Sequence, residues 1–322
     1  MDFLLRFSGE HEKLPRAELV GVLDGECLKF EIGRIFKEKR MILIDVDCKE
    51  YSFLKRLAYT REAYVVLGTG QKLEVLAEKA IEALAPEETF RVNAPSLILE
   101  RRLGALIAIK GFRVNLEKPD KIFYILEEKG SFILGQPVET GEEFEARKPQ
   151  NRPFFHPTSM HPKLARILVN LARIKPGDLV LDPFVGTGGI LIEAGLMGLN
   201  TKGWDVREDM IQGCIQNLKH YDLEGAVERM DAVSFQDKNE FVDAVVTDPP
   251  YGRGSFSSKK NPFTLYNDFL SRVGSWLKKN GFLVAVFPKE YKPSPANLNF
   301  CQTFDVYIHK SLTRKIWVFQ KK

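Results

Sequence analysis

The residues best suited to do chemistry form the run Asp248-Pro249-Pro250-Tyr251, which follows an apolar stretch over 242–247. The two prolines fix φ and have no N–H to donate, so they predict a rigid turn whose carbonyl groups stay free to accept hydrogen bonds. A carboxylate beside a carbonyl accepts both hydrogens of a planar amino group. The run therefore predicts a turn that binds an exocyclic amine of a nucleobase, and the alternative is a plain turn that ends a strand.

An exocyclic amine is a poor nucleophile because its lone pair is conjugated with the ring. Hydrogen bonds from its two N–H groups to Asp248 and to the Pro249 carbonyl would localise electron density on the nitrogen. Tyr251 would stack on the base, which is worth about 1–3 kcal/mol per base in single-strand binders. The base must be flipped or unpaired, and in-line methyl transfer to it depends mainly on positioning. The motif does not distinguish guanine, adenine and cytosine.

A second candidate site lies in 179–189, where a buried-type strand ends at Asp182 and a Gly-Thr-Gly-Gly turn opens a helix. Neither the nicotinamide fingerprint G-x-G-x-x-G nor a Walker loop is matched. A carboxylate at this turn would repel a pyrophosphate but suits a cofactor with an ammonium and a sulfonium. S-adenosyl-L-methionine fits, and the alternative is a glycine turn that merely connects strand and helix.

Two further acids follow candidate strands. Asp205 comes 23 positions after Asp182 and ends the next strand, where it suits ribose hydroxyls. Asp231 follows a third candidate strand and would face an adenine amino group, although alone it is equally typical of a surface turn. Together with the glycine turn, the paired acids favour a nucleoside-containing cofactor.

Alternating strands and helices must position these residues. Strands are expected at 179–181, 201–204, 242–247 and 282–287, and helices at 189–197, 207–219 and 265–278. This alternation predicts a doubly wound parallel sheet, and the closely joined runs 304–309 and 315–319 predict antiparallel strands at its end. The first half has candidate strands at 3–7, 41–46 and 63–67 and candidate helices at 73–84 and 96–109, which indicates an α+β module. Turn-forming and charged residues over 135–149 predict a linker.

Composition sets wider limits. The chain has 322 residues, enough for two domains, and a net charge of +4. The basic excess lies in residues 151–322, which is compatible with a polyanion partner without requiring one. Four scattered cysteines predict neither a disulfide framework nor a zinc site. With no signal segment and no apolar run long enough to span a membrane, we expect a cytoplasmic protein and no membrane partner.

These motifs resemble class I amino-methyltransferases that carry a D/N-P-P-Y motif. The run RPFFHPTSMHPKLAR over 152–166, together with DPPYGRG over 248–254, is similar to the archaeal tRNA (guanine-10 N2)-methyltransferases. Phe90-Arg91-Val92, Gly104, Val114-Asn115-Leu116 and Pro119-Asp120 resemble landmarks of the THUMP domain that these enzymes carry upstream.

The resemblance implies a fold and a division of the chain. A Rossmann-like class I methyltransferase with a doubly wound mixed sheet and an antiparallel end strand would occupy 156–322. A ferredoxin-like region would occupy 1–55, a THUMP RNA-binding domain 56–135, and a linker 136–155. The implied activity is transfer of one or two methyl groups from S-adenosyl-L-methionine to N2 of guanine 10 in tRNA. Some relatives need a small zinc-binding activator subunit.

The resemblance also implies roles for individual residues. The segment over 156–159 would approach the methionine end of the cofactor, with a hydroxyl of Thr158 or Ser159 bonded to its carboxylate. His156 and His161 lack a third ligand at metal-binding spacing, so we interpret them as residues that cap or orient this loop. The expected catalytic residues are Asp248, Pro249, Pro250 and Tyr251. The expected cofactor-binding residues are His156, Pro157, Thr158, Ser159, Asp182, Phe184, Gly186, Thr187, Gly188, Gly189, Asp205, Val206, Asp231, Ala232 and Asp248.

Two hypotheses concern the substrate. The basic, glycine- and serine-rich segment 252–261 is either a loop that closes over the target nucleotide or a plain surface loop. Arg101, Arg102, Lys110 and Arg113 either contact phosphates or form the polar face of a helix. Two alternatives to the tRNA function stay open: an amino-methyltransferase acting on adenine, cytosine or guanine in ribosomal RNA or DNA, and a non-catalytic RNA-binding factor with a vestigial cofactor site.

Overall fold

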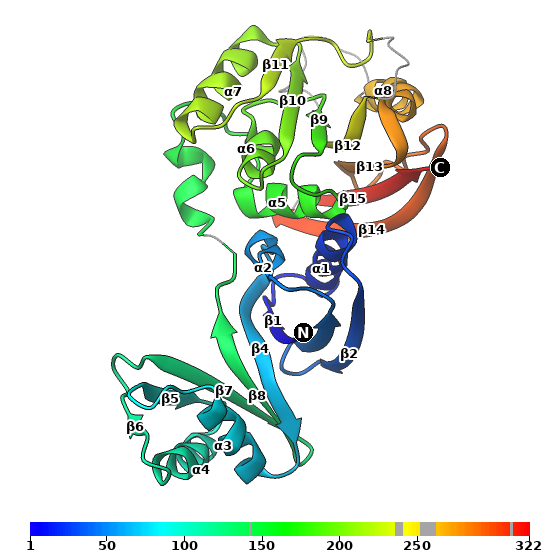
Figure 1. The fold of residues 1–322 in the computed structure, drawn as a ribbon. Coiled ribbons are helices and arrows are strands. Elements are labelled where there is room, and N and C mark those ends of the chain that lie inside the picture. The colour runs from blue at the N-terminus through cyan, green and yellow to red at the C-terminus, as the bar shows by residue number, and fades with distance from the viewer. Residues whose placement is uncertain (142, 236–240, 252–261, 310–311) are drawn as a thin grey trace. The chain divides into compact units, whose positions relative to one another are not determined.

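The computed structural model describes residues 1–141, 143–235, 241–251, 262–309 and 312–322. The chain divides into two compact units (Figure 1). The first contains residues 1–9, 28–55 and 60–141, and the second contains 10–27, 56–59 and 142–322. Within the described ranges, none of the helices combines the length and apolar character that a bilayer crossing requires.

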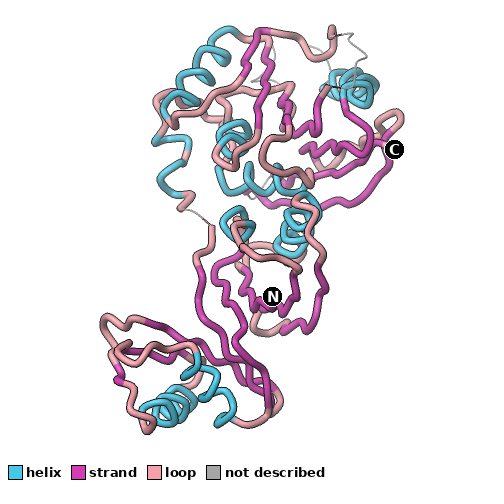
Figure 2. The backbone as a smooth tube through the Cα atoms, in the orientation of Figure 1, coloured by secondary structure: helices cyan, strands magenta, loops and turns pink. Residues whose placement is uncertain are grey.

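The first unit is built on one sheet with the strand order β2-β3-β1-β4-β8-β7-β5-β6. Its strands are β1 (Asp2–Phe7), β2 (Phe30–Phe36), β3 (Met41–Val46), β4 (Thr60–Gly70), β5 (Thr89–Asn93), β6 (Arg113–Val114), β7 (Lys121–Glu128) and β8 (Ser131–Val138). Helices α3 (Leu73–Glu82) and α4 (Leu97–Ala108) pack on β5, β7 and β8 through a core that includes Leu76, Leu103 and Phe123. The long antiparallel strands β4 and β8 run side by side (Figure 2).

The second unit holds a sheet with the order β11-β10-β9-β12-β13-β15-β14. Its strands are β9 (Leu179–Asp182), β10 (Asn200–Asp205), β11 (Ala226–Arg229), β12 (Val242–Thr247), β13 (Leu277–Pro288), β14 (Leu298–His309) and β15 (Leu312–Lys321). The strands from β11 to β13 are parallel, whereas β15 is antiparallel to both β13 and β14. The predicted doubly wound sheet with an antiparallel end strand is thus confirmed.

Both faces of the central strands are covered, which explains why β9, β12 and the second half of β13 are largely apolar and buried. Val180 and Val284 point to a core formed with α5 (Pro162–Leu171), whereas Leu181 and Leu283 point to a core formed with α8 (Pro262–Trp276). Helices α6 (Gly189–Gly195) and α7 (Glu208–His220) share a further cluster. This alternation is the period of two expected for a strand that is buried on both sides.

An early segment of the chain belongs to this second unit. Helix α1 (Leu14–Gly25) packs on α5, and the short helix α2 (Phe53–Arg56) ends where the chain enters this unit for the second time. The buried Glu18 carboxylate accepts hydrogen bonds from the N–H groups of Ala58 (2.8 Å) and Tyr59 (2.9 Å) and from Asn170 Nδ2 (2.8 Å). A buried carboxylate with three donors ties α1 firmly to α5.

The segment before α5 is also attached to the second unit. It contains two 3-10 turns, Glu145–Arg147 and Pro149–Asn151. The buried Glu193 on α6 pairs with Arg147 (2.9 Å) and with Arg166 of α5 (2.9 Å). These ion pairs fix residues 145–151 close to the helix that follows the glycine turn.

Candidate active site

The carboxyl ends of three neighbouring strands define the candidate site. Asp182 is the last residue of β9, Asp205 is the last residue of β10, and Asp248 directly follows β12. Because β9 pairs in parallel with both β10 and β12, these ends meet at one edge of the sheet. A cavity of about 830 Å³ lies there and is lined by all three acids together with Asp231.

This cavity brings together nearly all of the expected site residues. Those that line it are His156, Thr158, Ser159, Asp182, Phe184, Gly186, Thr187, Gly189, Asp205, Val206, Asp231, Ala232, Asp248, Pro249, Pro250 and Tyr251. Gly188 lies behind the lining as the N-cap of α6 with φ 83°, and Pro157 is not part of the lining. The expected lid segment 252–261 lies outside the described residues.

Hydrogen bonds hold the glycine turn around Asp205. Its carboxylate accepts from the backbone N–H groups of Gly186 (3.1 Å) and Arg207 (2.9 Å). Burial raises the pKa of Asp205, while the Arg207 and Gly186 bonds oppose that rise. The turn itself needs Gly186 and Gly188, since both have positive φ. The result is an acceptor of fixed orientation beside an exposed backbone turn.

Asp182 is the most deeply buried acid of the cavity. It is 2% exposed, and its Oδ1 accepts from Thr247 Oγ1 (2.7 Å) and the Phe184 N–H (3.1 Å). Burial raises the pKa of Asp182 to about 7, although both hydrogen bonds act in the opposite direction. A cationic ligand in the cavity would favour the ionised form of this group.

The segment over 156–159 is fixed beside the glycine turn. Ser159 Oγ lies 2.9 Å from Thr187 Oγ1, and His156 Nδ1 lies 2.8 Å from Thr158 Oγ1. His161 caps α5, because its Nδ1 accepts from the Lys163 N–H (3.3 Å). His161 is thus a helix cap, and His156 hydrogen-bonds within its own loop. Among the residues that the structure describes, no cluster of three or more His, Cys, Asp and Glu side chains suits a metal ion.

The Asp248 motif is also braced from several sides. The Tyr266 hydroxyl donates to the Pro250 carbonyl (2.8 Å). The single O–H of Tyr251 has two acceptors within reach, the Val286 carbonyl (2.9 Å) and the Asp248 carboxylate. Burial raises the pKa of Asp248, and the charge of Arg314 and the Tyr251 hydrogen bond oppose this rise. Burial also holds the pKa of Tyr251 well above its usual range, so this hydroxyl is a donor at neutral pH.

Arg314 is the functional residue that the sequence reasoning missed. Its Nη1 donates to Asp248 Oδ2 (2.8 Å), and the two residues are 66 positions apart. A signal was present, because an antiparallel strand at the end of a parallel sheet begins at the edge where the parallel strands end. The first residues of β15 therefore lie beside the site. Apolar side chains of the lining were also missed, namely those of Met160, Met210, Met230 and Val233.

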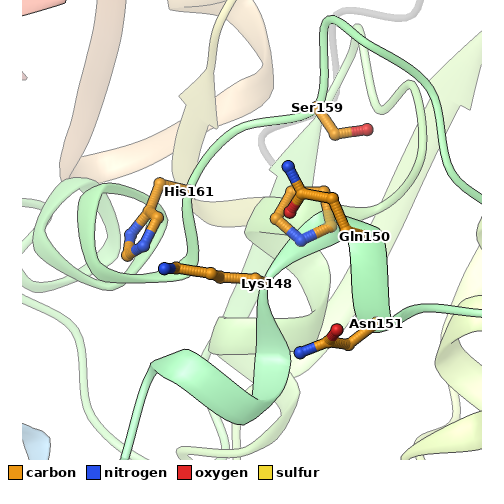
Figure 3. A pocket seen from close by; sticks show the side chains of 6 residues that line it. Lys148, Gln150, Asn151, Ser159 and His161 are labelled. Carbon is orange, nitrogen blue, oxygen red and sulfur yellow. The ribbon is translucent and has the colours of Figure 1, made fainter.

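A second, shallower hollow of about 420 Å³ lies next to this site. Figure 3 shows the Lys148 side chain extending toward the His161 ring, with Gln150 and Asn151 on the neighbouring turn. Ser159 lines both hollows. The lining of this second hollow has no acidic residue, whereas five aspartates line the larger cavity, so the larger cavity is the candidate active site.

Chemically, the larger cavity combines two functions. One part presents Asp182, Asp205 and Asp231 around a glycine turn, which suits a ligand with hydroxyl groups, amino groups and positive charge. The other part presents the Asp248 carboxylate beside the Tyr251 ring, which suits a planar amine. An ammonium-bearing nucleoside cofactor and an aromatic amine would therefore meet inside one cavity.

The comparisons with known proteins agree with this geometry. Residues 149–300 match the model of the family described as RMKL-like, methyltransferase domain. A tRNA (guanine(10)-N2)-dimethyltransferase of Methanothermobacter thermautotrophicus is 37% identical, and the match covers 100% of both chains. Its counterpart in Methanocaldococcus jannaschii is 32% identical over 98% of both chains.

Among solved structures, TrmN from Thermus thermophilus has the same fold, with a TM-score of 0.52, 22% identity and coverage of 100% of both chains. The archaeal relatives confirm the resemblance seen in the motifs over 152–166 and 248–254. From the full-length similarity, the chain belongs to the tRNA (guanine(10)-N2)-dimethyltransferase family.

Proposed function

We propose that this protein transfers methyl groups from S-adenosyl-L-methionine to the exocyclic N2 amine of guanine 10 in tRNA. The observation that carries the proposal is that Asp182, Asp205, Asp231 and Asp248 line a single cavity. The full-length archaeal relatives, which are named for this reaction, support the choice of base and position.

The residues present fit S-adenosyl-L-methionine. Asp205 is held by two backbone N–H groups, and its carboxylate would accept hydrogen bonds from the ribose hydroxyls. Asp231 follows β11 and accepts from the Val233 N–H (3.0 Å), so its carboxylate is fixed for an adenine amino group. Met210, Met230 and Val206 supply apolar lining for the adenine ring. Asp182 and the 156–159 segment would hold the amino acid end.

When bound, the cofactor supplies a methyl group on a sulfonium sulfur. Asp248 and the Pro249 carbonyl would accept hydrogen bonds from the two N–H groups of the guanine amine and so orient its nitrogen for the transfer. The cofactor would supply the methyl carbon and would leave as a neutral thioether. Asp248 or water then takes the proton from the methylated amine. Catalysis comes from the position of the amine and from the hydrogen-bond acceptors around it, so no covalent enzyme intermediate is needed.

The first half of the chain would bind the folded RNA. We assign 1–55 to a ferredoxin-like region, 56–135 to a THUMP domain, 136–155 to a linker and 156–322 to the methyltransferase domain. Arg101 and Arg102 on α4 and the nearby Lys110 and Arg113 are all exposed, which suits phosphate contacts. Recognition by shape and phosphates is the usual mode for double-stranded RNA. The activity implies a cytoplasmic protein.

A small zinc-binding activator subunit would pair with a sheet edge of the second unit. Strand β14 ends the sheet, and Phe300 (56%) and Tyr307 (67%) on it are exposed. An exposed strand edge with apolar side chains is a suitable template for strand addition. This part of the proposal predicts that the chain alone is poorly soluble or binds the cofactor weakly. Normal solubility and cofactor binding of the isolated chain would contradict it.

The deciding experiment is transfer of tritiated methyl groups into bulk tRNA, followed by mass spectrometry of the nucleosides. We expect N2-methylated and N2,N2-dimethylated guanosine with the wild-type chain, and loss of both with Asp248→Ala. Asp47→Asn, which changes an exposed carboxylate of the first unit, is the matched control and keeps full activity.

Other outcomes would favour the alternatives. Methylated adenosine or cytidine, or incorporation into ribosomal RNA or DNA only, would identify an amino-methyltransferase of different specificity. RNA binding without any cofactor binding would identify a non-catalytic factor with a vestigial cofactor site.

A further inference from the structure

Arg314 lies at the start of β15, where it pairs in register with Pro288 near the end of β13. This register places it at the edge of the sheet that carries the Asp248 motif. Its side chain is 17% exposed and that of Asp248 is 15% exposed. Both charges are therefore sheltered from bulk water, yet both line the cavity and can be reached from it.

The guanidinium makes two contacts at once. Nη1 donates to Asp248 Oδ2 (2.8 Å), and Cζ lies 4.3 Å from the centroid of the Tyr251 ring. The ring cannot easily turn, because its hydroxyl is bonded to the Val286 carbonyl (2.9 Å) and to Asp248. Tyr251 also packs against the apolar core formed with α5. The guanidinium thus lies over one face of a ring that lines the cavity.

A planar guanidinium and a planar base use an aromatic face in the same way. Under the proposed function, on which this inference rests, the target base stacks on Tyr251. The base and the guanidinium cannot occupy the same face together. We propose that Arg314 is a positioning residue that holds the Asp248 carboxylate and covers the Tyr251 face in the free protein until the substrate base displaces it from the ring.

This arrangement makes two opposite contributions to the kinetics. Displacement of the guanidinium uses part of the binding energy of the base. A substitution that removes the guanidinium should therefore lower KM for tRNA. The positive charge also keeps a buried carboxylate in its accepting form, so its removal should lower kcat. A decrease in both constants is typical of the removal of an interaction that substrate binding must break, whereas general damage to the site lowers kcat and raises KM.

The test compares Arg314→Met, which keeps length without charge, with Arg314→Lys, which keeps the charge without a planar group. For Arg314→Met we expect KM for tRNA to fall about threefold or more, and kcat at neutral pH to fall about tenfold. Arg314→Lys should recover much of kcat. Arg173→Met is the matched control, because Arg173 also pairs with an aspartate (Asp24, 2.9 Å) and lies over an aromatic ring (Phe282, 5.1 Å) in the second unit without lining the cavity. Its kinetics should stay at the wild-type level.

A second measurement needs no turnover. 2-Aminopurine riboside carries a 2-amino group, and its fluorescence is quenched when it stacks on an aromatic ring. With S-adenosylhomocysteine present, quenching should reach its midpoint at lower riboside concentration for Arg314→Met than for the wild type. This result would stand even if tRNA proved not to be the substrate, so failure of the proposed function and failure of this inference are distinguishable.

The inference is overturned by unchanged kinetics and quenching in Arg314→Met, by a rise in KM, or by lack of quenching in every variant. Intact S-adenosylhomocysteine binding by calorimetry confirms that each variant is folded.

Discussion

Thr247 Oγ1 donates a 2.7 Å hydrogen bond to Asp182 Oδ1, and this bond joins the last residue of β12 to the last residue of β9. Thr247 is fully buried and immediately precedes Asp248. The side chain that orients the acid at the cofactor turn therefore belongs to the strand that delivers the catalytic motif. Any shift of one strand end changes the geometry at the other.

Thr247→Val should weaken cofactor binding although Thr247 itself does not line the cavity. The substitution keeps the shape and removes the donor, which costs about 1–2 kcal/mol at a buried carboxylate. We expect the Kd for S-adenosylmethionine to rise about fivefold to thirtyfold at pH 7 by calorimetry. Thr247→Ser keeps the hydroxyl and should bind like the wild type. Equal affinities for all three proteins would show that this hydrogen bond does not matter.

Cofactor affinity should depend on pH through Asp182. Its pKa is raised to about 7 by burial, so the group is neutral below pH 7 and ionised above it in the folded protein. An ionised carboxylate binds a cationic ligand better, and affinity for S-adenosylmethionine should therefore increase from pH 6 to pH 8. The ligand also titrates, so the readout is the ratio of wild-type affinity to that of Asp182→Asn. A ratio that stays constant with pH would contradict the assignment.

The same shift has a consequence for stability. A carboxyl group has a pKa near 3.9 in the unfolded chain, so between about pH 4 and pH 7 the folded state binds more protons at Asp182 than the unfolded state. The contribution of this group to the free energy of unfolding therefore falls as pH rises through that window. Asp182→Asn removes this contribution, and the difference between the two denaturation curves against pH isolates it.

Much of this site could be predicted because it follows strand ends. Asp182, Asp205 and Asp248 each end an apolar run, and parallel strands bring such ends to one edge whatever their separation in sequence. The position of Arg314 at the start of an antiparallel end strand was a signal that it lies near the site, but its role could not be predicted, because that depends on one side-chain contact with Asp248. The grouping of α1 with the second unit could not be predicted from the sequence either, because it depends on the hydrogen bonds that the buried Glu18 accepts from residues distant in the chain.

Glu193→Gln should be strongly destabilising although Glu193 does not line the cavity. Glu193 is fully buried between Arg147 and Arg166, and its loss leaves two buried cations with weaker compensation. Breaking a buried ion pair by removal of one partner costs about 3–5 kcal/mol. We expect a loss of this size in the free energy of unfolding by urea denaturation. The control Glu74→Gln, at an exposed position of α3, should change it little.

Gly188→Ala should lower both stability and cofactor affinity. Comparison with Gly177→Ala should separate the effect of backbone strain from that of a steric contact. Gly188 has φ 83°, and a Cβ there would lie 2.7 Å from Cys214 Sγ on α7. Gly177 also has positive φ, 90°, but a Cβ at that position meets open space. Gly177→Ala should therefore cost only the backbone strain, about 1–2 kcal/mol, whereas Gly188→Ala should cost the strain and the contact with sulfur.

Removing the sulfur separates the two effects. In Gly188→Ala/Cys214→Ala the contact is gone, so the double variant should lose less stability than the sum of its single variants, as measured by thermal unfolding. Cofactor affinity should recover in parallel, because relief of the contact lets α6 and its glycine turn return to their places beside Asp205. Strict additivity of the two substitutions would mean that backbone conformation alone requires glycine at position 188.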